Sequence, residues 1–181
     1  MGDSYQQIVD LHATVQEAPR LARTVLRYLI ERGVICGEAS DSALGGPRGY
    51  RPGPNFKEAV GGRLVHFLEV QPNGVCCEIG RTVFHAGGNS DKVLCPICHT
   101  DASSSDWTDA VDRWFQGDDA AAHTCQHCGI ASRITQWDFD FVWAFGNLGF
   151  TFWNWPPLRP QFVEQISSLL AHEVRVVCGR L

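Results

Sequence analysis

The sequence has very little lysine and no long apolar run. Only two of its 15 basic residues are lysines, Lys57 and Lys92, and its formal net charge is −5. A chain with this balance has no general electrostatic attraction for nucleic acids or anionic membranes. No segment approaches the roughly 20 apolar residues of a membrane span. We therefore expect neither a nucleic acid nor a membrane as partner.

Targeting signals are also missing from the sequence. The N-terminus lacks a basic start followed by an apolar run, and Gln6 stands where myristoylation requires Ser or Thr. Four scattered cysteines, at positions 36, 76, 77 and 178, are typical of reduced thiols rather than of a secreted disulfide framework. We expect a cytoplasmic protein, and its 181 residues are enough for a single domain over 1–181.

The catalytic motifs that commonly accompany paired cysteines are absent. No His-x-Glu precedes the Pro-Cys-x-x-Cys of a zinc deaminase, and His172-Glu173 does not continue into His-Glu-x-x-His. There is no Walker loop and no Gly-x-Ser-x-Gly elbow. A His-Asn-His nuclease would have to accept a polyanion beside an acidic segment, which disfavours it. We expect a protein that is not an enzyme.

Two CxxC pairs carry the strongest chemical information in the chain. Cys95 and Cys98 form the first pair, and Cys125 and Cys128 form the second after 26 intervening residues. Each pair can turn two thiolates toward one ion, so together they supply the four ligands of a closed tetrahedral zinc site. Because four protein ligands leave no open position, we predict a structural Zn²⁺ in a zinc-ribbon subdomain over 91–135.

Alternatives to the four-cysteine zinc site remain open at this stage. The pairs could form two disulfides or stay as buried free thiols. A neighbouring histidine, His99, His123 or His127, could also replace one cysteine as ligand.

The segment between the pairs predicts an amphipathic, acidic helix. Asp106 can cap it, and Gly117 can end it. Apolar residues follow at helical spacing: Trp107, Ala110, Val111, Trp114 and Phe115. Residues 100–124 hold six aspartates against Arg113, a local net charge of −5. Capping and solubility explain part of this charge, and a basic partner explains the surplus. The expected contacts are Asp106, Asp109, Asp112, Asp118 and Asp119.

A Gly/Pro-rich stretch over 36–55 predicts a long loop without helix or strand. Such loops inside compact domains are commonly binding loops, although a structural wrap over the core is an equal alternative. The side chains that favour binding are Arg48, Tyr50 and Arg51.

The remaining pattern predicts an α+β fold with N-terminal helices, an antiparallel sheet, an embedded four-cysteine zinc ribbon with a helical insert, and an aromatic C-terminal hairpin, helix and strand. Ile8, Leu11 and Val15 indicate a first helix, and a second runs from Pro19 to Gly33. An Asn-Gly pair predicts a hairpin of 63–70 with 75–85. Alternating aromatics predict strands over 137–145 and 148–152, broken at 146–147. A helix over 160–172 and a strand over 174–178 follow.

Three parts of the sequence together resemble a group of small bacterial cytosolic zinc-ribbon-like proteins. They are residues 50–55 (YRPGPN), the two CxxC pairs, and residues 144–158 (AFGNLGFTFWNWPPL). Some members of this group look like immunity proteins against delivered antibacterial toxins. The resemblance covers most of the chain from Tyr50 onward and supplies no catalytic residues. It implies a binder that protects its producer by docking on a toxin domain.

We therefore expect an immunity protein whose acidic surface covers the basic site of a toxin domain, such as a nuclease. A nucleic-acid-binding zinc-ribbon regulator is the first alternative, and its contacts would be Arg20, Arg23, Arg27, Arg48 and Arg51. A metal-dependent hydrolase is the second, and it would require an exchangeable water on the zinc ion.

Overall fold

A computed structural model describes residues 2–44, 48–62, 67–86, 92–140 and 142–181. Within these ranges the chain combines three α-helices with an antiparallel six-stranded main sheet, which confirms the α+β class. The strand order is β10-β1-β9-β4-β3-β2. The bounds are β1 Ser4–Asp10, β2 Ile35–Ser40, β3 Gly49–Pro52, β4 Val75–Phe84, β9 Ala144–Trp153 and β10 Val174–Arg180.

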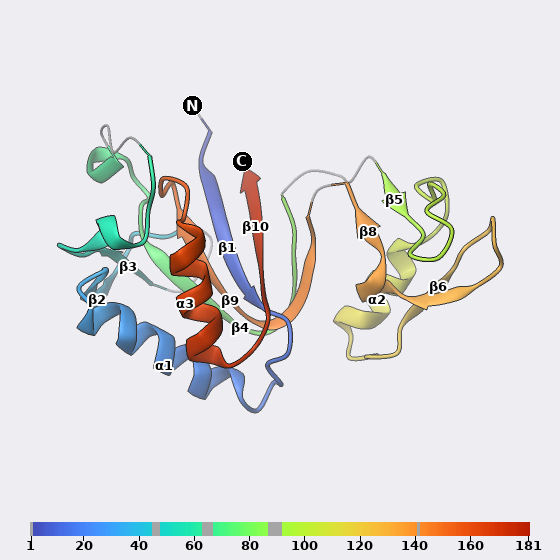
Figure 1. Ribbon diagram of the computed structural model, residues 1–181, viewed down its shortest axis with the longest axis horizontal. Coiled ribbons are helices and arrows are strands. Elements are labelled where there is room, and N and C mark those ends of the chain that lie inside the picture. The colour runs from blue at the N-terminus through green and yellow to red at the C-terminus, as the bar shows by residue number, and fades with distance from the viewer. Residues whose placement is uncertain (1, 45–47, 63–66, 87–91, 141) are drawn as a thin grey trace.

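Two helices cover one face of the main sheet (Figure 1). They are α1, Ala18–Glu31, and α3, Pro160–Leu170, and each has a proline in its first turn. Leu21, Val25 and Leu29 of α1 are buried, as their spacing predicts. Gly33 adopts a φ of 68°, which ends this helix at little steric cost. No helix in the described ranges is long and apolar enough to cross a membrane.

Residues 92–140 form a smaller unit, here called the cysteine lobe, at one end of the long axis of the molecule (Figure 1). Its strands β5, Val93–Leu94, and β8, Asp138–Phe139, pair with each other, as do β6, Ala122–Thr124, and β7, Ala131–Arg133. Helix α2, Thr108–Phe115, lies between the cysteine pairs. The lobe has its own apolar cluster, which Phe145 of β9 joins from the main sheet.

The prediction of a first helix through Ile8, Leu11 and Val15 is wrong. These residues belong to β1 and the loop after it, and Val15 is exposed. Ile8 and Val9 are both fully buried because β1 lies between β10 and β9, with apolar neighbours on both faces of the sheet. Three apolar residues in eight positions did not distinguish a helix from a buried strand.

The aromatic C-terminal hairpin is also absent from the described residues. Strand β8 has only two residues, and β9 runs without a break through Gly146 and Asn147. Its partners are β1 and β4 rather than the residues before it. Gly146 lies inside β9, where the strand comes close to β1. A Cβ at this position would lie 2.6 Å from the carbonyl oxygen of Asp10, so only glycine fits this close approach.

The other predicted segments have mixed outcomes. The strand over 75–85 is confirmed as β4, whereas residues 67–69 of its expected partner form a 3₁₀-helix, Phe67–Glu69. Residues 63–66 lie outside the described ranges. The stretch 36–55, expected to lack regular structure, contains most of β2 and all of β3. The helix and strand expected after residue 160 are confirmed as α3 and β10.

Candidate metal centre

The four cysteine sulfurs of the two CxxC pairs lie within 4.8 Å of one another. The Sγ atoms of Cys95 and Cys128 are 3.9 Å apart, and those of Cys98 and Cys125 are 3.7 Å apart. A tetrahedron with Zn–S bonds of about 2.3 Å has sulfur–sulfur edges of about 3.8 Å. A disulfide would need a sulfur–sulfur distance of about 2.05 Å. The geometry therefore fits one tetrahedral ion and excludes disulfides between these sulfurs.

The two pairs sit on turns with the same backbone hydrogen bonds. In each turn the backbone carbonyl of the first cysteine accepts a hydrogen bond from the N–H four residues later. The backbone N–H of the same cysteine donates a hydrogen bond to the carbonyl five residues later. The bonds are His99 N to Cys95 O (2.9 Å), Cys95 N to Thr100 O (3.1 Å), Gly129 N to Cys125 O (2.9 Å) and Cys125 N to Ile130 O (3.1 Å). This repeat presents the two sulfurs of each pair to a common centre.

Each turn also places one residue in the left-handed region at the same position. Gly129 has a φ of 72° and His99 a φ of 56°. Glycine adopts this conformation easily, whereas histidine does so at a steric cost. The left-handed conformation of His99 is therefore a requirement of the turn, and the side chain of His99 is exposed.

The sequence left open whether a histidine replaces one cysteine, and the geometry favours the four cysteines. Among the described residues, the group with metal-ligand spacing contains only these cysteines. His123 bonds instead to the Ser105 hydroxyl through Nε2 (2.8 Å) and packs against Trp137. Desolvation lowers the pKa of His123. His127 is exposed on its turn.

The thiols of the site differ in how readily they lose their protons. Hydrogen bonds from the Thr100 side chain and backbone lower the pKa of the Cys98 thiol to about 6. The backbone hydrogen bond from Ile130 favours the Cys128 thiolate, but burial and the neighbouring sulfurs outweigh it and raise the pKa of Cys128 to about 11. Binding of a cation to all four sulfurs would therefore displace protons.

The five aspartates predicted to contact a partner are all exposed on the cysteine lobe. Arg113 pairs with Asp109 (3.1 Å) and approaches Asp118 (3.7 Å). Asp119 pairs with Arg81 of β4 (2.7 Å), an internal contact that sequence analysis missed. Asp106 accepts a hydrogen bond from Thr108 (3.2 Å) instead of capping α2 through its side chain. Part of the acidic charge is thus balanced within the chain.

An exposed apolar side chain lies close to these aspartates in the sequence. Phe115, predicted to be buried, ends α2 with 56% of its surface exposed, whereas Ala110 and Trp114 form the buried face of the helix. Helical spacing placed Phe115 beside the buried face, but Phe115 is the last residue of α2 and is not covered by the rest of the lobe.

The other predicted partner contacts lie at β3, at the end of the molecule opposite the cysteine lobe (Figure 1). Tyr50 is partly buried against the main core, and Arg51 donates through Nε to the Ser40 hydroxyl (3.3 Å). Arg48 is exposed just before the strand. Tyr50 therefore has a packing role, and the structure does not bring these three residues together with the aspartates.

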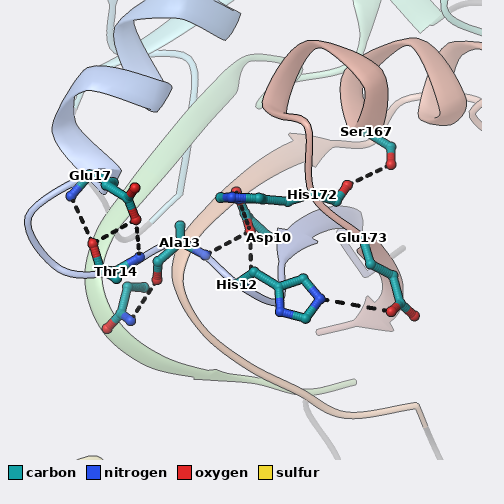
Figure 2. Close-up of polar contacts among 9 residues, drawn as sticks. Asp10, His12, Ala13, Thr14, Glu17, Ser167, His172 and Glu173 are labelled. Atoms are coloured by element: carbon teal, nitrogen blue, oxygen red, sulfur yellow. Dashed lines mark hydrogen bonds and ion pairs between the residues drawn. The ribbon is translucent and has the colours of Figure 1, made fainter.

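A buried polar pair that no sequence pattern indicates joins the end of β1 to the segment after α3. Asp10 is fully buried at the end of β1, and its carboxylate accepts a hydrogen bond from Nδ1 of His172 at 2.9 Å (Figure 2). The two residues are 162 positions apart, so no local pattern could link them.

Comparison with protein-family models, curated proteins and solved structures finds no match. The function is therefore inferred from the site itself.

Proposed function

We propose that the four cysteines hold a structural Zn²⁺ and that the protein is a non-catalytic binding protein, an immunity protein that covers the basic site of a toxin domain. The sulfur spacing supports the metal. Thiolates suit zinc, and four of them form a closed shell. Zinc would then fix the two turns and the segment between them, including α2.

The acidic end of α2 supports the binding role, and it is the observation that carries the proposal. Phe115 is exposed, and in the sequence it lies between Asp112 and the adjacent residues Asp118 and Asp119, which are exposed as well. An aromatic anchor with a charged rim is the usual composition of a protein-binding hot spot. Four thiolates around one Zn²⁺ would add about two negative charges to this lobe.

A partner with a basic cleft fits this surface. A nuclease holds phosphates in such a cleft, and carboxylates on a rigid helix can compete for it with little loss of conformational entropy. In this account the cysteine lobe supplies the charge and Phe115 supplies the buried contact.

The test is affinity capture from the native host, followed by quantitative mass spectrometry. One variant carries Asp106→Asn, Asp109→Asn, Asp112→Asn and Asp118→Asn, and leaves Asp119 to pair with Arg81. A control variant loses the same charge at exposed sites of the main sheet unit: Glu31→Gln, Glu38→Gln, Asp41→Asn and Glu164→Gln.

We expect wild type and the control to capture one protein with a basic toxin-like domain, and the aspartate variant to capture at least tenfold less of it. Phe115→Ala should weaken the same interaction without loss of zinc. Equal capture by all variants would contradict the proposal. Retention of DNA or RNA that falls steeply with salt would favour the nucleic-acid-binding alternative.

A further inference from the structure

A cavity of about 580 Å³ lies where the cysteine lobe meets the main sheet. One wall is the loop of residues 11–16 after β1, and another is the stretch 145–147 of β9. Trp114, Asp119 and Thr135 of the cysteine lobe close it from the other side. This volume and this position between two apolar clusters are typical of small-molecule sites.

The loop wall is held in place by a buried hydrogen-bond network. The Asp10 carboxylate accepts from the backbone N–H groups of His12 and Ala13, each at 2.9 Å, and from Nδ1 of His172 (Figure 2). Thr14 donates through its hydroxyl to Glu17 (2.7 Å), which steadies the start of α1. Such a wall needs no reordering on binding, which favours affinity.

The neighbouring strand fixes the same loop from the other side. Nδ2 of Asn147 donates to the carbonyl of Ala13 (2.8 Å). Oδ1 of Asn147 is buried and has no hydrogen-bond partner among the described residues. Asn147 also lines the cavity, so both walls contribute polar groups to it.

The charged lining of the cavity has an excess of arginine. Arg81 and Arg175 line it together with the single carboxylate of Asp119. Asp119 pairs with Arg81 at 2.7 Å. Arg175 donates to the carbonyl of Trp143 (3.1 Å), and within the described ranges no carboxylate forms an ion pair with it. The guanidinium of Arg175 is therefore the positive group left for a ligand.

Aromatic and aliphatic side chains also contribute to the lining. The indole of Trp114 packs edge-to-face on Phe145, with ring centroids 5.0 Å apart, and Leu11 and Val15 lie across the cavity. A planar apolar group fits against such surfaces. We propose that this cavity binds a small organic anion, a phosphate monoester or a carboxylate that carries an aromatic ring, with its charged group on Arg175.

Calorimetric titration of the zinc-loaded full chain with three probes tests this site. The probes are inorganic phosphate, phenyl phosphate and benzoate, and the last two distinguish phosphate from carboxylate recognition. The variant is Arg175→Gln, and the control is Arg23→Gln on the exposed face of α1, which removes the same charge away from the cavity.

We expect phenyl phosphate or benzoate to bind at least tenfold more tightly than inorganic phosphate. Arg175→Gln should weaken that binding at least tenfold, and Arg23→Gln should leave it unchanged. Chemical-shift changes on binding should concentrate at residues 11–16 and 145–147. Absence of binding by all three probes at 10 mM would overturn the proposal, as would equal affinities of wild type and Arg175→Gln.

Discussion

The guanidinium of Arg81 lies over the ring of Trp114, 4.1 Å from its centroid, and joins β4 of the main sheet to α2 of the cysteine lobe. Arg81 also donates through Nε to the carbonyl of Trp114 and pairs with Asp119 at 2.7 Å. Only 17% of its side chain is exposed. One arginine thus makes three kinds of contact between the two parts of the protein.

Replacement of Arg81 should therefore loosen this connection. We expect Arg81→Gln to lower the free energy of unfolding by about 2–3 kcal/mol, because a partly buried cation–π contact and a charged hydrogen bond are lost. Urea titration of the zinc-loaded protein measures this change. Arg23→Gln, at an exposed helix position, should change stability by less than about 0.5 kcal/mol. Equal effects of the two substitutions would contradict the role of Arg81.

Gly146 should be intolerant of a side chain. A Cβ at this position would lie 2.6 Å from the carbonyl oxygen of Asp10 and 3.0 Å from Cγ1 of Val9, both in the adjacent strand. We expect Gly146→Ala to destabilise the fold by about 2–4 kcal/mol, since β1 or β9 must shift. Gly61→Ala is the matched control, because its Cβ would have its nearest contact at 3.8 Å. Thermal unfolding of both variants measures the difference. A Gly146→Ala protein as stable as Gly61→Ala would show that the two strands shift at little cost.

Glu78 should make stability depend on pH. Burial raises the pKa of Glu78, against the opposing effect of a hydrogen bond from the Thr151 hydroxyl. The pKa of Glu78 is higher in the folded state than in the unfolded state. The stability that Glu78 contributes is therefore fully present below the unfolded pKa and is lost as the pH rises through the folded pKa.

We therefore expect Glu78→Gln to gain stability relative to wild type as pH rises from about 4.5 to 7, because glutamine stays neutral while the buried carboxyl ionises. Denaturant titrations of both proteins at several pH values measure this difference. A constant difference across the range would show that Glu78 titrates as an exposed carboxyl does.

Local sequence patterns predicted the cysteine cluster and the segments that form α1, α2 and α3 for a physical reason. The CxxC spacing encodes its own turn, and Pro19 and Gly33 mark the first turn and the end of α1 within one short segment. The prediction of four cysteines around one centre needed no knowledge of the rest of the fold. The choice of zinc stays a prediction that the spacing of the sulfurs supports.

The predictions that were wrong concern segments whose local structure depends on strand pairing in the main sheet. Ile8 and Val9 became a central strand because β9 and β10 flank it, and those partners are more than 130 residues away in sequence. Gly146 was expected to break a strand, whereas it allows close approach to β1. Arg81 of β4 and Arg175 of β10 line one cavity because both strands pair with strands distant in the sequence, so no local motif could indicate them.

Metal content per chain decides whether the four cysteines hold a zinc ion. Wild-type protein, measured by inductively coupled plasma mass spectrometry after gel filtration, should contain about one zinc per chain, and Cys125→Ser should contain far less and unfold at a lower temperature. Cys178→Ser, at an exposed cysteine outside the site, should keep the metal. Zinc-free wild-type protein, or Cys125→Ser with an unchanged zinc content, would contradict the account.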